Sequence, residues 1–273
     1  MPELPEAETL ARDLDAPLRG RTIAGVRVPH ADVLRGIRPA TLARRLKGRS
    51  VIRVWRRAKA VVVDFSEGQH LVVGLGFTGG LSIQPRGAPA DAYDAIRFAL
   101  RDGATLAYRD VRRLGRVSLL DTRAFAAFDE RVGVEPLGPA FTPEALSVFI
   151  RSSRQPIKKL VMDQRRIAGV GNIYANEALW AAGIDPSRPG DRIEPDEAAA
   201  LWHAIVDVLS RAIEARGTTF RDFRDASGER GQFVFQLVAY GREGLPCIRC
   251  GTPLVLTHAI DQRATVFCYR CQR

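Results

Sequence analysis

The sequence predicts an α+β protein of several domains, with a β-rich N-terminal part, a helical middle and a C-terminal hairpin that carries cysteines. Its 273 residues are more than one hydrophobic core usually organises. Short β-rich segments separated by Gly, Pro or Asp fill residues 21–120, whereas helical periodicity prevails after residue 140. All four cysteines lie in the last 27 residues, in two CxxC units.

The N-terminal part should begin with a helix and continue as strands. In PEAETLARDLDAPLRG, Leu10, Leu14 and Leu18 recur at helical spacing, Pro5 suits the first turn and Gly20 ends the segment. The expected strands are TIAGVRV, SVIRVWRR, AVVVDF, HLVVGLGF, GGLSIQP, AIRFAL, TLAYRD and GRVSLLD, with a short helix near ATLARRLKG. This pattern is typical of a β-sandwich or barrel with flanking helices.

The helical part follows an expected linker. The segments TPEALSVFIRSS, QPIKKLVMDQ, NIYANEALWAAG and PDEAAALWHAIVDVLSRAIEARG have helical periodicity. Gly169 and Gly171 separate two of them, and Asn172 should cap the next helix. Glycines and a helix start expose backbone N–H groups that favour a phosphate, although an ordinary helix–turn–helix corner has the same pattern. The expected boundaries are 1–120, 121–140, 141–235 and 236–273.

The cysteines have the spacing of a zinc ribbon, with Cys247-x2-Cys250 followed after 17 residues by Cys268-x2-Cys271. Four thiolates complete a tetrahedral zinc shell, so we expect one structural Zn²⁺ with no open position for a substrate. Disulfides suit a cytoplasmic chain less well. His258, between the two units, is interpreted as a polar loop residue rather than a ligand.

The composition favours a polyanionic binding partner and argues against a membrane-spanning helix. The formal net charge is +10 and the pI about 10.1, although a GC-rich genome that uses Arg in place of Lys would also raise the Arg content. No apolar run approaches the roughly 18 residues of a membrane helix. The N-terminus lacks the basic and apolar regions of a signal peptide, so we expect a cytoplasmic protein.

Motifs throughout the chain point to one known family. They are PELPEAET, RRAKAVVVDF, DVRRLG, MDQRRIAGVGNIYANEALWAAGIDP, GTTFRDF and YGREGLPCIRCGTPLV with QRATVFCYRCQR. Together they resemble the formamidopyrimidine-DNA glycosylases. The resemblance implies a β-sandwich, a helix–two-turn–helix domain and a zinc finger, with damaged double-stranded DNA between the halves. It also implies a monomeric repair enzyme that excises oxidised purines, namely 8-oxoguanine and formamidopyrimidines, and cuts the strand by β,δ-elimination.

The same resemblance implies catalysis at the N-terminus. Removal of Met1 would leave Pro2 as a secondary amine, and α-amino groups titrate near about 7.7–8.0, so a useful fraction is neutral and nucleophilic. Pro2 would form the Schiff base at C1′, and Glu3 would donate a proton at the sugar. Glu6 either supports this site or is a first-turn acid that stabilises the helix dipole.

Other matched positions are implied to contact DNA. Lys59 and Arg263 would bind phosphate or donate protons for β- and δ-elimination respectively. The remaining implied contacts are Asn172, Lys158, Arg112, Phe77 and Leu114; the neighbouring Lys159 leaves the choice of Lys158 open. Glu177 would support the lesion pocket. The segment from Asp225 to Phe233, with Gly228 and Gly231, corresponds to a mobile loop that closes over the everted base.

The chain departs from the family pattern where wedge residues fill the gap left by an everted base. Phe77 stands where methionine is usual, Leu114 where phenylalanine is usual, Gly74 where a histidine is common and Val111 where proline is usual. These changes leave the N-terminal chemistry intact, but they do not decide which damaged base the enzyme excises. Alternatives are an endonuclease VIII-like enzyme for oxidised pyrimidines or abasic sites, a damaged-DNA-binding protein without catalysis, and an RNA-binding zinc-ribbon protein. The start PELPE rather than PEGP favours the purine enzyme.

Overall fold

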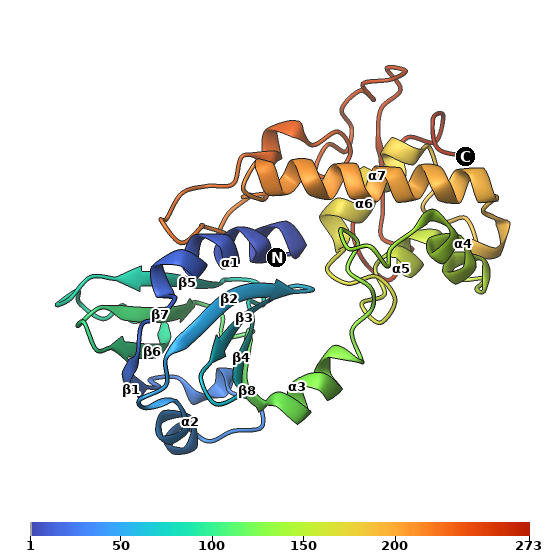
Figure 1. Ribbon diagram of the computed structural model, residues 1–273. Coiled ribbons are helices and arrows are strands. Elements are labelled where there is room, and N and C mark those ends of the chain that lie inside the picture. Colours follow the sequence, from blue (N-terminus) through green and yellow to red (C-terminus); the bar gives the residue numbers. More distant parts are fainter. Residues whose placement is uncertain (1) are drawn as a thin grey trace. The chain divides into compact units, whose positions relative to one another are not determined.

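The computed structural model describes residues 2–273, which form two compact units (Figure 1). The first, called the sandwich unit, comprises residues up to Arg131 together with residues 215–232. The second, called the helical–zinc unit, comprises residues 132–214 and 233–273. The 215–232 loop therefore belongs to the sandwich unit, although it follows the long helix of the other unit in sequence.

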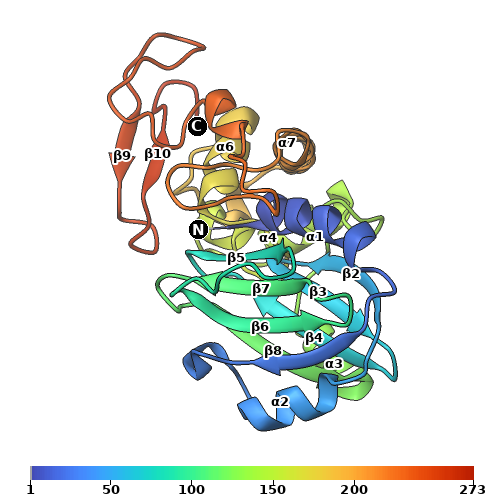
Figure 2. The same ribbon diagram turned by 90° about the vertical axis from the view of Figure 1, so that its left-hand side faces the viewer.

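Two four-stranded antiparallel sheets make the sandwich, in the orders β1–β6–β7–β5 and β2–β3–β4–β8 (Figure 2). Inward-facing residues such as Val61, Val63 and Leu71 of one sheet share a core with Ile96 and Phe98 of the other. The strands are β1 Ile23–Arg27, β2 Val51–Arg57, β3 Ala60–Phe65, β4 Gln69–Gly74, β5 Gly79–Gln84, β6 Asp94–Leu100, β7 Thr105–Asp110 and β8 Arg116–Asp121.

Helices cover the sandwich. Helix α1 (Leu4–Leu18) buries Leu10, Leu14 and Leu18 in the shared core and runs beside β2 in Figure 1. Helix α2 (Pro39–Leu46) buries Leu42 and Leu46, and the short η1 (Ala31–Val33) precedes it. Both predicted helices are thus confirmed.

A further helix, α3 (Thr122–Asp129), lies in the segment that the sequence marked as a linker. Phe125 and Phe128 pack over Ala60, Val62 and Val72, on the outer face of the β2–β3–β4–β8 sheet. This cover explains why all six residues of β3 are buried, on both faces. None of the residues of α3 is fully buried, so its apolar pattern is too sparse to predict a helix from sequence.

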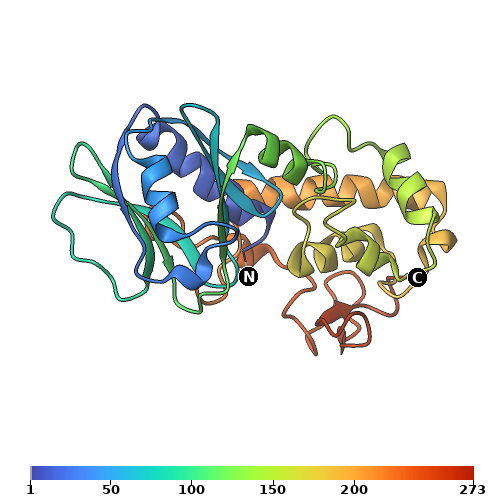
Figure 3. The same ribbon diagram turned by 90° about the horizontal axis from the view of Figure 1, so that it is seen from below.

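The helical–zinc unit contains α4 (Pro143–Arg151), α5 (Ile157–Val161), α6 (Asn172–Ala182), η2 (Gly190–Arg192), α7 (Pro195–Glu214) and η3 (Phe233–Gln236). Helix α6 is buried along most of its length and packs against α5, α7 and the hairpin of β9 (Val255–Thr257) and β10 (Thr265–Phe267) (Figure 3). Such all-round burial is expected of a central helix. The predicted fold class, with its sandwich, helix–two-turn–helix part and cysteine-bearing hairpin, is confirmed.

Two local predictions differ from the structure. Gly171, and not Asn172, is the N-cap of α6; Asn172 is the first helical residue. Helix α5 begins only at Ile157 and ends at Val161, because Pro156 precedes it and a short turn follows. Among residues 2–273, no helix is both long and apolar enough to cross a membrane.

Candidate functional site

The start of α1 is buried and held by its own side chains. Pro2 is buried, and Glu3, the N-cap of the helix, is only 2% exposed. The backbone N–H of Glu3 donates to Oε2 of Glu6 over 2.7 Å, as in a capping box. The two residues predicted to carry the chemistry therefore sit on a fixed helix start rather than on a loose terminus.

Glu6 also ties this helix start to the 215–232 loop. Its Oε1 accepts the backbone N–H of Thr218 over 2.7 Å. Gly217, at φ 82°, passes so close that a Cβ there would lie 2.9 Å from Cγ of Glu6. One buried carboxylate thus joins the segment around Pro2 to the loop predicted to cover the lesion.

Arg216 forms a second connection between the loop and α1. Its guanidinium donates to Asp13 of α1 over 2.6 Å and to Asp225 of the loop over 2.6 Å. Asp225 also accepts the backbone N–H groups of Ser227 and Glu229, each at 2.9 Å. Burial opposes ionisation of Asp225, but Arg216 and these N–H groups lower its pKa below the usual value.

The ends of the loop are closed on each other. The backbone N–H of Gln232 donates to the carbonyl of Ala215, and that of Gly231 donates to Oγ1 of Thr219. A Cβ on Gly231 would lie 2.3 Å from the Gly217 carbonyl oxygen, so glycine is needed there for close approach. A cavity of about 180 Å³ lies between the loop and β5.

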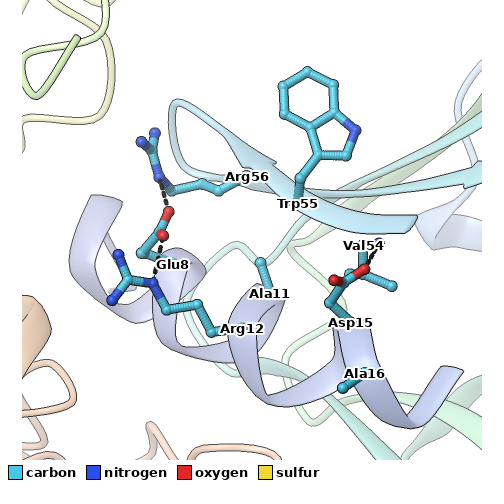
Figure 4. A pocket seen from close by; sticks show the side chains of 8 residues that line it. All are labelled: Glu8, Ala11, Arg12, Asp15, Ala16, Val54, Trp55 and Arg56. Carbon is cyan, nitrogen blue, oxygen red and sulfur yellow. Dashed lines mark hydrogen bonds and ion pairs between the residues drawn. The ribbon is translucent and has the colours of Figure 1, made fainter. Parts of the chain in front are cut away.

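A second cavity of about 390 Å³ lies between α1 and β2 (Figure 4). Glu8 accepts hydrogen bonds from Arg12 of its own helix and from Arg56 of β2, over 2.7 and 2.8 Å. Asp15 accepts the backbone N–H of Val54. Because its charged lining groups bond to one another, we interpret this cavity as part of the polar contact that holds α1 on β2.

Lys59 lies in the tight turn between β2 and β3, where Ala58 has φ 52°. It is half-buried, and the next residue, Ala60, pairs with Gly74 at the end of β4. The position that usually carries a histidine is therefore beside the Lys59 turn. Gly74 pairs in turn with Arg116 of β8.

The predicted wedge residues lie on two loops of the sandwich unit. Phe77 is in the β4–β5 loop and is 44% exposed; Leu114 is in the β7–β8 loop and is 47% exposed. The guanidinium of Arg112 lies 4.8 Å from the centre of the Phe77 ring. The structure thus brings all three residues to one edge of the sandwich unit.

In the helical–zinc unit, Lys158 is buried beneath the hairpin. It is 1% exposed, and its Nζ donates to the carbonyl of Ala264 over 2.9 Å and to Oγ1 of Thr265 over 2.8 Å. Nδ2 of Asn172 donates to the same carbonyl over 3.0 Å. Two residues predicted to contact DNA thus meet at the base of the hairpin loop that carries Arg263.

Arg263 is exposed in the turn between β9 and β10. Its guanidinium lies 3.5 Å from a carboxylate oxygen of Asp261, and Nζ of Lys159 lies 4.0 Å from the other oxygen. Lys159 is about half exposed, in contrast to the buried Lys158. The exposed basic groups of this region are therefore Arg263 and Lys159.

Glu177 of α6 organises the chain that follows the 215–232 loop. Its carboxylate accepts the consecutive backbone N–H groups of Val238, Ala239 and Tyr240, at 2.9, 2.9 and 2.7 Å. Burial raises the pKa of Glu177, while the three N–H groups and Arg211 act against that rise. Its observed role is to hold this turn on α6.

The four cysteine Sγ atoms lie within 4.8 Å of one another, and those of Cys250 and Cys268 are 3.5 Å apart. A tetrahedron with Zn–S bonds of about 2.3 Å has edges of about 3.8 Å, so the cluster fits zinc. Cys247 and Cys268 pack with Trp180, Leu254 and Val266 in a small core. The predicted structural zinc site is confirmed, and it joins the hairpin to the end of α6.

Sequence reasoning missed three connecting residues. Asp110 and Arg216 organise loops, and Asn176 accepts the backbone N–H of Val266 and donates to the carbonyl of Asn172. Asp110 directly precedes the DVRRLG loop, and an Asp at a strand end is a signal for side-chain bonding to a turn. No comparable local signal marks the contact of Arg216 with Asp13 or that of Asn176 with Val266, because these partners are distant in sequence.

Comparisons with known proteins place the chain. Residues 1–117 match the model of the formamidopyrimidine-DNA glycosylase N-terminal domain, and residues 132–224 match that of the H2TH domain of the same enzymes. A curated formamidopyrimidine-DNA glycosylase of Chloroflexus aggregans is 42% identical, covering 100% of this chain and 98% of that protein. One of Moorella thermoacetica is 43% identical over 93% of both chains.

Solved structures agree. The Fpg protein of Thermus thermophilus has a TM-score of 0.88 and 36% identity, covering 99% of this chain and 98% of its own. A mutant Fpg of Lactococcus lactis bound to DNA containing Fapy-dG has a TM-score of 0.93 and 27% identity, covering 100% of both chains. With both domain models and the full length matched, the chain belongs to the formamidopyrimidine-DNA glycosylase family.

Proposed function

We propose that this enzyme excises oxidised purines from duplex DNA and then cleaves the strand at the resulting abasic site. The observation that carries the proposal is the fixed helix start bearing Pro2 and Glu3, in a chain that matches glycosylases over its whole length. Further support comes from solved relatives bound to DNA with Fapy-dG or an abasic site.

Pro2 is the proposed nucleophile once Met1 is removed. The lone pair of its nitrogen attacks C1′, the bond from C1′ to the base breaks, and the base leaves with a proton. Glu3 protonates the sugar ring oxygen as the ring opens, which leaves an iminium ion between Pro2 and C1′. An amine in a capped helix start is held in one orientation, and such orientation accelerates bimolecular attack.

Strand cleavage follows from the acidity that the iminium confers on neighbouring carbons. Loss of the C2′ proton breaks the C3′–O bond, and a second elimination breaks the C5′–O bond, so both phosphates leave. We assign proton donation in these two steps, or contact with the leaving phosphates, to Lys59 and Arg263. The product is a one-nucleotide gap with phosphate at both ends.

Zinc has a supporting part in this proposal. Cys247, Cys250, Cys268 and Cys271 fill its coordination shell, so it supplies no Lewis-acid position and only fixes the hairpin. Residues 2–273 contain no membrane-spanning helix, and the basic composition suits DNA. We propose that the protein acts as a cytoplasmic monomer on damaged duplex DNA.

A second substrate class is supported by one comparison. A wild-type Lactococcus lactis Fpg with a TM-score of 0.92 and 27% identity was solved with DNA containing an oxidised pyrimidine. This chain also has Phe77 and Leu114 at the proposed wedge positions, both about half exposed. Oxidised pyrimidines are therefore the alternative substrate, with the same Pro2 chemistry.

Borohydride trapping tests both assignments. The processed protein would be mixed with duplexes that carry 8-oxoguanine opposite C, an oxidised pyrimidine or an abasic site. A covalent complex with 8-oxoguanine supports the purine assignment, and one with only the pyrimidine duplex selects the alternative. Absence of trapping on every duplex, despite binding, would contradict catalysis.

Two variants test the nucleophile. An N-terminal extension that survives processing acylates Pro2 and should abolish trapping while DNA binding persists. Pro2→Gly replaces the secondary amine with a primary one and should trap weakly. An extended protein that cleaves as well as the processed one would rule out Pro2, whatever the lesion.

A further inference from the structure

At one edge of the sandwich unit, two neighbouring loops connect the two sheets. The β4–β5 loop runs from Gly74 to Gly79, and the β7–β8 loop runs from Asp110 to Arg116. Both ends are paired across strands: Gly74 with Arg116 in one sheet, and Gly79 with Asp110 in the other. The two crossovers therefore run side by side in opposite chain directions, with their ends paired to each other.

Three large apolar side chains are exposed on these loops, beside the exposed Arg112 and Arg113. Phe77, Val111 and Leu114 are 44%, 41% and 47% exposed. Single exposed apolar side chains are common, but apolar side chains that cluster on the surface call for a functional reason. The Arg112 guanidinium covers the Phe77 ring at 4.8 Å, a cation–π contact between the two loops.

Beneath this surface lies a buried carboxylate, Asp110, which is 0% exposed. Its Oδ1 accepts the hydroxyl of Thr78 over 2.5 Å. Its Oδ2 accepts the backbone N–H of Gly115 over 2.8 Å and the hydroxyl of Tyr108 over 3.2 Å. Asp110 thus bonds to one residue of each loop and to the strand below.

Thr78 extends the network back to the other loop. Its Oγ1 donates to Asp110 and accepts the backbone N–H of Arg112 over 2.9 Å. Burial and the neighbouring Asp110 both raise the pKa of Tyr108, so its hydroxyl stays protonated and donates. Each oxygen of the network therefore has a defined donor or acceptor role.

Glycines allow the backbones to approach this closely. A Cβ on Gly76 would lie 2.6 Å from the backbone nitrogen of Gly115, and one on Gly115 would lie 1.8 Å from the Tyr108 hydroxyl oxygen. Neither glycine position has room for a side chain, so the two loop backbones pack directly against each other. The polar network and this packing connect the two loops.

We propose that Asp110 is a positioning residue which locks Phe77, Arg112 and Leu114 into one preformed wedge for base eversion. The inference rests on the proposed function, because it needs a base that leaves the duplex. Eversion costs a few kcal/mol of stacking and pairing. A wedge that is already ordered fills the gap without an additional ordering cost, whereas two mobile loops would lose entropy on insertion.

Asp110→Asn tests the network at nearly constant shape. An amide is neutral and offers one acceptor oxygen. With its NH₂ towards Gly115 the backbone N–H loses its acceptor, and with its NH₂ towards Thr78 the hydroxyl must turn to accept, so in either case a charge-assisted bond of Asp110 is lost. We expect single-turnover excision from the lesion duplex to slow by about tenfold or more, the factor that roughly 1.4 kcal/mol produces. Cleavage of an abasic duplex, which has no base to evert, should change by less than about twofold on the same reasoning.

Thr78 provides the matched pair of variants. Thr78→Val keeps the shape but removes the hydroxyl that connects Asp110 to the Arg112 backbone, whereas Thr78→Ser keeps the hydroxyl. Thr78→Val should therefore reproduce the loss seen in Asp110→Asn, and Thr78→Ser should not. A 2-aminopurine placed next to the lesion should report slower unstacking in the two impaired variants only.

The readouts separate positioning from simple destabilisation. Urea unfolding of each variant gives its loss of stability independently of activity. Equal slowing on lesion and abasic duplexes, or unchanged excision by Asp110→Asn, overturns the positioning role. A wild-type protein that traps no abasic duplex overturns the proposed function instead, before any variant is compared.

Discussion

Lys158 and Lys159 are adjacent in sequence but occupy opposite environments. The ammonium of Lys158 is buried on the Ala264 carbonyl and the Thr265 hydroxyl, whereas Lys159 is half exposed and 4.0 Å from Asp261. A buried ammonium is stable only when its bonds are made, so this position supports the hairpin loop that presents Arg263. Direct contact of Lys158 with DNA stays a prediction.

Replacing either lysine with methionine separates these roles. Lys158→Met removes the two buried hydrogen bonds that the ammonium donates, to the Ala264 carbonyl and the Thr265 hydroxyl, and should destabilise the protein by about 1–3 kcal/mol. Lys159→Met should leave stability within about 0.5 kcal/mol and weaken DNA binding only at low salt. Urea unfolding and anisotropy binding at several salt concentrations measure both. Equal stability of the two variants would contradict the supporting role of Lys158.

Arg263 is the exposed basic residue that the hairpin presents. Arg263→Ala should weaken binding to all DNA sequences and reduce the slope of log K against log salt by about one. Arg270, exposed on the second CxxC turn, is the matched control, since Arg270→Ala keeps the total charge change the same. A slope that falls equally in both variants would show a general charge effect rather than a phosphate contact.

At the scale of elements, the 215–232 loop is attached to α1 at two places. Glu6 accepts from Thr218, and Arg216 bonds to Asp13 and Asp225. Glu6 and Asp13 are seven residues apart, two helical turns, and so lie on one face of α1. The loop is therefore pre-attached to the helix whose start carries Pro2, which would lower the ordering cost of the cover that the sequence predicts over an everted base.

The Asp225 contacts give this attachment a pH dependence. The pKa of Asp225 is lowered in the folded protein, so its ionised form stabilises the fold above the unfolded value of 3.8. That contribution is lost as pH falls through the lower folded pKa. Proteolysis within residues 215–232 should rise below pH 4 in the wild type. The Asp225→Asn variant should already be susceptible to proteolysis at pH 7. A variant that resists proteolysis would show that the Arg216–Asp225 contact does not hold the loop on α1.

At the scale of the whole molecule, two compact units share one chain that crosses between them three times. The zinc cluster and Trp180 share a small core in the helical–zinc unit, whereas Trp55 lies in the sandwich unit. The sandwich has its own large core from both sheets and α1. The loss of zinc should therefore affect the two units unequally.

Chelation tests this expectation with the native tryptophans. Removing zinc should change the emission of a Trp180-only variant and abolish DNA binding, because metal coordination supplies much of the folding energy of such hairpins. A Trp55-only variant should show little change in its emission. Full trapping activity after verified zinc removal would contradict the need for the ordered hairpin.

Several features could be read from the sequence because their signals are local. Leucines at helical spacing predicted α1, short β-rich segments between Gly, Pro or Asp predicted the strands, and the CxxC units predicted the zinc site. Helix α3 was not predicted because Phe125 and Phe128 are only partly buried, and their packing depends on the sheet beneath them. The predicted catalytic and DNA contacts, and the boundaries at 120, 140 and 235, stay predictions.

The sequence by itself determined the family, the sandwich and helical parts and the metal ligands, since each depends on residue types at short spacing. Only the tertiary structure decided that Lys158 supports the hairpin, that Arg216 clamps the 215–232 loop to α1, and that Asp110 joins the two wedge loops. The physical reason is that the role of each of these charged side chains depends on the groups it bonds to in the folded chain. Thr265 is 107 residues from Lys158 and Asp13 is 203 from Arg216, so no local pattern can reveal them.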